Sequence, residues 1–182
     1  SFDWLHFTVA LLFHDIGYVR NILGGDSEVS QLINAEGKTL ALGSGDTDAS
    51  LTPYHVERGK MFINERNWPD EIDYNLLSEL ISYTQFPIPD HGAAKSKEEE
   101  KFRSLAALVG SADLIGQLAD PMYDVKLPRL FYEFNETGSA GKMGYETPAD
   151  LRTGYPTFFI NFVRPHIGEA LKYLQVTDEG KS

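Results

Sequence analysis

Prolines and glycines divide this chain into segments of helix length, and this division constrains the fold more than any other feature. Within the segments, apolar residues recur every three or four positions, which is the spacing of one helix face. Alternation of apolar and polar residues, which is typical of strands, is confined to one short region. Helices are therefore expected over residues 2–16, 52–66, 71–84, 97–119 and 127–135, from 147–148 onward, and once or twice after 159 with a joint at Pro165. The sequence predicts an all-α fold.

The ends of several helices carry their own signals. Gly17 follows the first helical pattern and is typical of a residue that ends a helix. Thr52 and Pro53 are of the types preferred at the N-cap and at the first helical position. Pro121 cannot continue the longest helix, because proline lacks the N–H that an inner helical position donates. These residues predict where helices start and stop.

A stretch rich in glycine, aspartate and serine runs from residue 21 to 51. Inside it, residues 29–33 and 38–42 flank Asn34-Ala35-Glu36-Gly37, a pattern that predicts a small β-hairpin. A loop region of this length inside a compact domain is usually an insertion, a lid or a binding loop. We therefore expect one domain over residues 1–182, a helical bundle whose insertion over about 21–51 covers a pocket and sets substrate choice.

Composition excludes several classes of function. The chain has 27 acidic and 16 basic residues, a net charge of −11, and no basic stripe, so a nucleic-acid polymer is not an expected partner. It has no cysteine, which excludes disulfides, thiolate metal sites and cysteine nucleophiles. No apolar stretch reaches the ~20 residues that span a bilayer, and no signal-peptide pattern opens the chain. We expect a cytoplasmic protein that is missing a segment before its apolar first helix.

His14 and Asp15 form the most informative dipeptide of the chain, at the end of an apolar helical pattern. Adjacent residues on a helix point about 100° apart, so the two side chains are not expected to pair with each other. Both can still reach one ion beyond the helix end. The alternative is a core histidine beside a turn aspartate.

Asp113 is a carboxylate within a nearly apolar helical stretch, residues 105–119. A buried carboxylate must be paired, protonated or bound to a metal. An ion pair with an arginine or lysine from elsewhere is one possibility. The other is that His14, Asp15 and Asp113 supply one nitrogen and two carboxylates to a divalent cation, for which Mn, Mg, Fe, Ni, Co and Zn are all candidates.

The strings Leu11-Leu12-Phe13-His14-Asp15-Ile16-Gly17-Tyr18 and Ser111-Ala112-Asp113-Leu114-Ile115 resemble the HD-domain metal-dependent phosphohydrolase superfamily. The resemblance implies an HD-domain-like helical bundle and one or two divalent metals. It also implies hydrolysis of phosphomonoesters or phosphodiesters, with His14, Asp15 and Asp113 as metal ligands.

The histidine that opens the family's ligand pattern has no evident counterpart here. His6 lies ~12 Å from His14 along a continuous helix, which is too far for one ion, so we assign His6 to packing. The missing ligand could come from a segment outside this chain, which we favour, or from His91 or His166. Otherwise the site is incomplete.

His55 falls in the first turn of its helix, where N–H groups and positive potential favour an anion such as phosphate. The spacing of His55 and Gly59 resembles that of two-metal members of the superfamily, in which this histidine lies by the metals. Residues 81–86 lack the further histidines of such members, so one metal is expected. His55 is then the general acid or a phosphate contact. Otherwise it only supports the helix start.

Three cations are candidate phosphate contacts: Arg58, Arg20 and Lys60. A solvated surface role is the alternative for each. The resemblance leads to a phosphohydrolase whose metal-activated water is oriented or deprotonated by Asp15 or Asp113 and whose leaving oxygen is protonated by His55. The substrate is expected to be a small phosphorylated molecule, with nucleotides among the candidates. The alternatives are a non-catalytic HD-type binding or regulatory module with a structural or degenerate metal site, and a helical adaptor.

Overall fold

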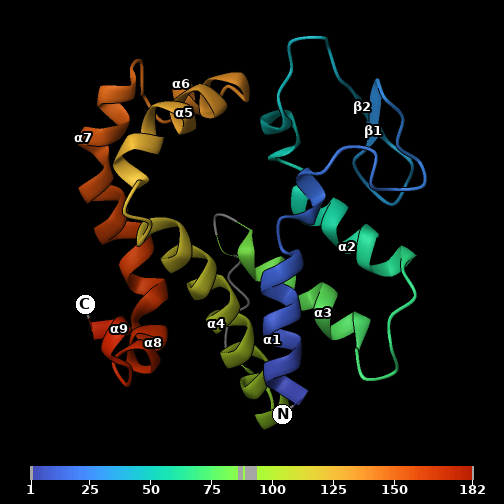
Figure 1. Ribbon diagram of the computed structural model, residues 1–182, viewed down its shortest axis with the longest axis vertical. Helices are drawn as coiled ribbons and strands as arrows, with labels where there is room; N and C mark the ends of the chain where they lie inside the picture. The colour runs from blue at the N-terminus through green and yellow to red at the C-terminus, as the bar shows by residue number, and fades with distance from the viewer. Residues whose placement is uncertain (1, 86–87, 89–93, 182) are drawn as a thin grey trace. The chain divides into compact units, whose positions relative to one another are not determined.

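The computed structural model describes residues 2–85, 88 and 94–181 of the chain (Figure 1). Its internal contacts divide the chain into two compact units, residues 1–94 and residues 95–182. Each unit is described by itself below.

The first unit contains helices, short 3₁₀ turns and one hairpin, in the order α1 (Phe2–Phe13), η1 (Ile16–Tyr18), β1 (Ser30–Leu32), β2 (Thr39–Ala41), η2 (Asp48–Leu51), α2 (His55–Glu65), α3 (Tyr74–Ile81) and η3 (Ser82–Thr84). The second contains α4 (Lys97–Leu118), α5 (Tyr123–Glu136), α6 (Ser139–Lys142), α7 (Pro148–Phe158), a π-helical segment (Phe159–Val163), α8 (Arg164–Leu174) and α9 (Asp178–Lys181). The predicted helical fold with a small hairpin insertion is confirmed.

In the first unit, α3 packs against both α1 and α2, and α2 also packs against η1 (Figure 1). The apolar face predicted for the third helix is buried: Leu77, Leu80 and Ile81 have no exposed surface. Ala10 of α1 and Ile63 of α2 are equally buried. This core holds α1, α2 and α3 together.

The hairpin forms as predicted. Strands β1 and β2 are antiparallel, with Gln31 opposite Leu40. The turn closes with a hydrogen bond from the backbone N–H of Ile33 to the carbonyl of Lys38, at 2.8 Å. Gly37 has a φ of 86°, a left-handed conformation that glycine adopts without steric cost.

Several predicted helix ends differ from the structure. α3 begins at Tyr74, not at residue 71, and α5 begins at Tyr123, not at residue 127. α2 begins at His55, not at Thr52, because the backbone N–H of Thr52 bonds the carbonyl of Ala49 and continues the preceding 3₁₀ turn η2. α1 ends at Phe13, before the predicted residue 16, and Gly17 is buried inside η1 instead of ending the helix. At the end of α1 and at the start of α2, a 3₁₀ turn takes the place of the predicted helical turn.

The start of α3 offers a direct measure of local stabilisation. The Asp73 carboxylate accepts hydrogen bonds from the backbone N–H groups of Asn75 and Leu76, both at 3.0 Å. Replacing Asp73 by alanine should lower the free energy of unfolding by about 1 kcal/mol, as measured by chemical denaturation. The matched control is Asp70→Ala, three residues earlier and exposed, for which a change within about 0.5 kcal/mol is expected. Equal effects of the two substitutions would contradict the cap.

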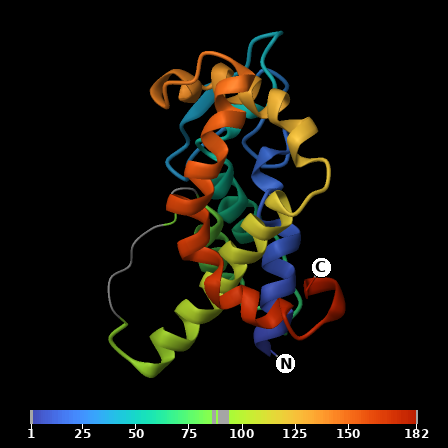
Figure 2. The same cartoon turned by 90° about the vertical axis from the view of Figure 1, so that its left-hand side faces the viewer.

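In the second unit, α5 packs against α7 and α4 packs against α8. A cluster of apolar side chains from α5, α6 and α7 forms a core in this unit: Leu127, Phe131, Ala140 and Leu151. Figure 2 shows α7, the π-helical segment and α8 following one another in a continuous helical run, coloured orange to red. The π-helical turn ends just before Pro165, which has no N–H to donate, so the predicted joint is confirmed as a local change of helix type.

Candidate metal-binding site

His14 and Asp15 lie between α1 and η1, beyond the end of the regular helix. His14 Nε2 lies 3.3 Å from Asp15 Oδ2. We expected adjacent side chains on a helix to point apart. They converge because α1 ends at Phe13, so helical geometry no longer separates them.

The spacing of these two atoms matches that of two ligands on one cation. Zinc and similar divalent cations bind histidine nitrogen and carboxylate oxygen at about 2.0–2.2 Å. Two ligands at ~2.1 Å are about 3.0 Å apart in an octahedron and about 3.4 Å apart in a tetrahedron. The distance between these two atoms is therefore compatible with two positions of a single coordination sphere, as it is with an ion pair between the two side chains.

Two histidines of this unit are held by the same type of backbone contact. The Nδ1–H of His14 donates to the carbonyl of Leu11 at 2.8 Å, and the Nδ1–H of His55 donates to the carbonyl of Thr52 at 2.7 Å. Because a carbonyl oxygen can only accept, the lone pair of each neutral ring is on Nε2. Metal-binding histidines are commonly oriented by such a bond. Both rings thus leave Nε2 for a further partner. For His14 this partner is the Asp15 carboxylate while Nε2 is protonated, and a cation could take the place of that proton.

His55 shares the electrostatic environment of the His14–Asp15 pair. Its ring stacks on Tyr18 of η1, with ring centroids 4.4 Å apart and planes 17° from parallel. Partial burial raises the pKa of Asp15, but the hydrogen bond and charge of His14 and the charge of His55 lower it further, so the net shift is downward. Asp15 is therefore a carboxylate at neutral pH, as a cation ligand must be.

Close backbone contacts bring these residues together. A Cβ on Gly17 would lie 1.8 Å from the carbonyl oxygen of His55, so only glycine fits between η1 and α2. A Cβ on Gly59 would lie 3.6 Å from a methyl carbon of Ile16 and 3.8 Å from the carbonyl oxygen of His14. The four-residue spacing of His55 and Gly59 thus places the end of α1 against the first turns of α2.

The remaining proposed ligands have other surroundings. Asp113 lies on α4 of the second unit, half-buried, where the side chain of Gln117 donates to its Oδ1 at 2.7 Å. His166 also belongs to the second unit, and its Nδ1–H donates to the carbonyl of Phe162. His91 lies outside the described residues. In the described part of the chain, no three histidine, aspartate or glutamate side chains form a group that could hold a metal ion.

His6 has the packing role that we assigned to it. The ring is fully buried, its Nδ1–H donates to the carbonyl of Phe2, and its Nε2 accepts the backbone N–H of Asp73, both at 2.8 Å. Both ring nitrogens are therefore occupied: Nδ1 bonds within α1, and Nε2 joins α1 to the start of α3.

Arg58 does not match its predicted role as a phosphate contact. The side chain is fully buried, and all five of its N–H donors bond within the fold, two of them to the carboxylate of Asp26. No donor remains for a phosphate. The structure gives Arg58 a structural position instead.

The other two predicted phosphate contacts lie at the surface. Arg20 donates from Nε to Asp48 and from an NH2 group to the carbonyl of Asp46, at 2.7 and 2.8 Å. Lys60 pairs with Glu57, with Nζ 3.6 Å from the carboxylate. Five positions on a helix correspond to about 140° of rotation, so Lys60 is not on the face of α2 that carries His55.

Two further residues were not singled out from the sequence: Tyr18, which stacks on His55, and Asp26, which pairs with Arg58. Tyr18 stands in the quoted His14–Asp15 motif but had no assigned role. Asp26 is one of several aspartates in the loop-rich stretch, and nothing local distinguishes it from the others. Its partner Arg58 is 32 positions away along the chain.

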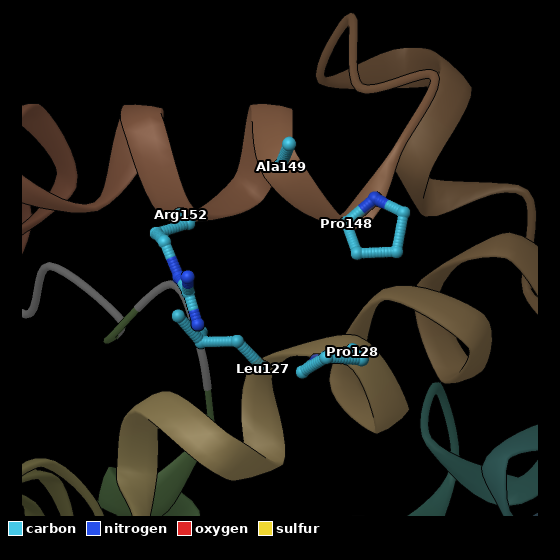
Figure 3. A pocket seen from close by; sticks show the side chains of 5 residues that line it. All are labelled: Leu127, Pro128, Pro148, Ala149 and Arg152. Atoms are coloured by element: carbon cyan, nitrogen blue, oxygen red, sulfur yellow. The ribbon is translucent and has the colours of Figure 1, made fainter.

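A separate hollow of about 190 Å³ lies in the second unit, between α5 and α7 (Figure 3). It is lined by Leu127, Pro128, Pro148, Ala149 and Arg152. Its lining is almost entirely apolar, and its one charged residue already forms an ion pair with Asp124. It shares no residue with the His14–Asp15–His55 group.

No helix in the described part of the chain is long and apolar enough to cross a membrane.

Comparison with known proteins gives one match. No curated protein and no solved structure matches the chain. One protein-family model does match, over residues 1–182, and its description is Npun_R2479-like.

Proposed function

The chain belongs to the Npun_R2479-like family, and we propose that it is a divalent-metal-dependent phosphohydrolase of the HD type. The observation that carries the proposal is the arrangement of His14 and Asp15, whose side-chain atoms are 3.3 Å apart. Nδ1 of His14 is anchored to a backbone carbonyl, so Nε2 and the carboxylate present two donor atoms with the spacing of one coordination sphere.

In this proposal His14 and Asp15 hold the cation, and the resemblance to HD proteins adds Asp113 as a further ligand. A divalent cation so held would acidify a water molecule and neutralise charge on the phosphoryl oxygens. Asp15 stays ionised at neutral pH because its pKa is lowered, so it can also accept a hydrogen bond from the attacking water.

His55 is proposed to protonate the leaving oxygen or to hold the phosphate. The stacked ring of Tyr18 and the bond from Nδ1 to Thr52 fix the imidazole plane and leave Nε2 as the atom that exchanges a proton. The proposed substrates are small phosphorylated molecules, including nucleotides. Arg20 remains a candidate phosphate contact, whereas Arg58 is left out because its donors are used inside the fold.

Substitution of Asp15 by asparagine tests the proposal. We expect the wild-type chain to bind Mn²⁺ in a calorimetric titration and to hydrolyse p-nitrophenyl phosphate or bis(p-nitrophenyl) phosphate only with added metal. Asp15→Asn should weaken Mn²⁺ binding by at least ~10–100-fold and reduce turnover to background, because the replacement removes a charged ligand. Asp113→Asn is tested in parallel, and weaker Mn²⁺ binding in that variant would show that Asp113 also holds the ion.

The control is Asp70→Asn, which changes the net charge equally at an exposed turn of the same unit and should leave binding and turnover unchanged. Unchanged turnover in Asp15→Asn would reject the proposed site. Mn²⁺ binding without turnover of any phosphate ester would favour a non-catalytic HD-type binding module. This alternative draws support from the sequence, which has no evident counterpart of the first ligand histidine and lacks further histidines over residues 81–86.

A further inference from the structure

Arg58 and Asp26 form a buried ion pair between α2 and the loop-rich stretch. Their side chains are 0% and 1% exposed. The guanidinium meets the carboxylate through two parallel hydrogen bonds of 3.1 and 3.0 Å. This bidentate geometry is the strongest form of an arginine–carboxylate contact.

The remaining donors of Arg58 reach three backbone carbonyls. Nε donates to Gly17 at 2.7 Å, one NH2 group to Val19 at 2.9 Å and the other to Leu32 at 2.5 Å. One side chain therefore joins α2, the turn that follows His14 and Asp15, and the end of strand β1.

Asp26 is equally saturated. Besides the two bonds from Arg58, its carboxylate accepts the backbone N–H groups of Ile22, Leu23 and Leu32 at 2.7–3.1 Å. A carboxylate with this many donors orders the surrounding loop. Glu65, the last residue of α2, and Arg66, which follows it, add bonds to the same stretch, at Gly24 and Ile22.

The pair stands next to the candidate metal site along the chain and in space. Arg58 follows His55 by three positions on α2, and the carbonyl that its Nε binds belongs to Gly17, two positions after Asp15. We infer that Arg58 is a positioning residue that holds the Asp15 turn against His55, and that residues 19–33 form a fixed support for this turn. The sequence suggested that the insertion is a lid over a pocket. The bonds of Arg58, Asp26 and Glu65 anchor the part of this insertion over residues 19–33 to α2.

Arg58→Lys tests this inference, whose metal readout rests on the proposed function. Lysine keeps the charge but cannot bridge four partners, because it lacks the planar fork of guanidinium. Two measurements are made on the full chain. One is the affinity for Mn²⁺. The other, on the metal-free chain, is the position of the imidazole NMR signals of His14 and His55, with His166 of the second unit as an internal reference.

We expect Arg58→Lys to weaken Mn²⁺ binding about 10–100-fold, as loss of a residue that orients a ligand does. It should also shift the signals of His14 and His55 while those of His166 stay in place. The matched control is Arg66→Lys, which changes the arginine that directly follows α2 and bonds the same loop but not the turn at Gly17. It should leave both measurements as in the wild type.

Wild-type signals of His14 and His55 in a folded Arg58→Lys chain would overturn the inference. Shifted signals in a protein that binds no Mn²⁺ in either form would support the positioning role and count against the proposed metal site. If Arg58→Lys does not fold, Asp26→Asn carries the same test. That variant retains the three bonds from Arg58 to backbone carbonyls and weakens only the two bonds from Arg58 to the side chain at position 26. Smaller shifts in the same signals are therefore expected. Unchanged signals there would also overturn the inference.

Discussion

Gly17→Ala should destabilise the first unit by about 3 kcal/mol or more, the upper part of the range for overpacking. The added Cβ would lie 1.8 Å from the carbonyl oxygen of His55, 2.7 Å from its carbonyl carbon and 2.8 Å from the backbone nitrogen of Gly59. All three atoms belong to the backbone of α2, so no side-chain rotation can relieve the contact. Either η1 or the first turn of α2 must move.

The measurement is chemical denaturation, together with Mn²⁺ affinity, since movement of η1 displaces Asp15 from His55. Gly59→Ala is the matched control. Its Cβ would meet Ile16 at 3.6 Å, an ordinary contact, and alanine is favoured over glycine inside a helix by up to about 1 kcal/mol. We therefore expect this variant to be as stable as the wild type or more so. If the two alanine variants were equally stable, the close approach of η1 to α2 would be contradicted.

Asp26→Ala should cost about 3–5 kcal/mol, because it leaves the buried guanidinium of Arg58 without its counter-charge. It also removes the acceptor of three backbone N–H groups. The matched control is Asp124→Ala, which breaks another two-bond contact of aspartate with arginine, at Arg152. Those side chains are 67% and 58% exposed, so a loss of only about 0–1 kcal/mol is expected. Similar losses in the two variants would contradict the buried position of the first pair.

The same pair predicts how stability depends on pH. Burial raises the pKa of Asp26, but the hydrogen bonds and charge of Arg58 and the backbone N–H groups lower it further, so its folded pKa lies below the ordinary aspartate value. Its contribution is therefore complete above the unfolded pKa of about 3.9 and is lost as pH falls through the lower folded value. Denaturation at pH 7 and near pH 3 should show the difference between wild type and Asp26→Ala shrinking at the lower pH. If the stability difference between wild type and Asp26→Ala grew at the lower pH, this prediction would be contradicted.

Much of the secondary structure was predictable because its signals are local. The hairpin follows from two short apolar runs around a glycine turn, and α4 was predicted to within a residue of its observed ends. His14 and Asp15 could be singled out because they are adjacent in an apolar context. The start of α2 could not be placed, because the preceding η2 takes up the N–H of Thr52.

The position of Arg58 shows what a local pattern misses. From the sequence it was one of three candidate phosphate contacts, and a surface role was the alternative considered. Its partners in the structure lie 26 to 41 positions away, at Asp26, Leu32, Val19 and Gly17. Nothing within a few residues of position 58 distinguishes a buried, five-bonded arginine from an exposed one.

The sequence by itself therefore determined the helical class, the hairpin and the His14–Asp15 pair, since these depend on residues a few positions apart. The tertiary structure alone decided that the two side chains converge, that His55 and Tyr18 stack beside them, and that Arg58 is enclosed. Those features depend on where the ends of α1 and α2 meet. Such long-range packing is set by the shape and burial of whole elements, which no short stretch of sequence encodes.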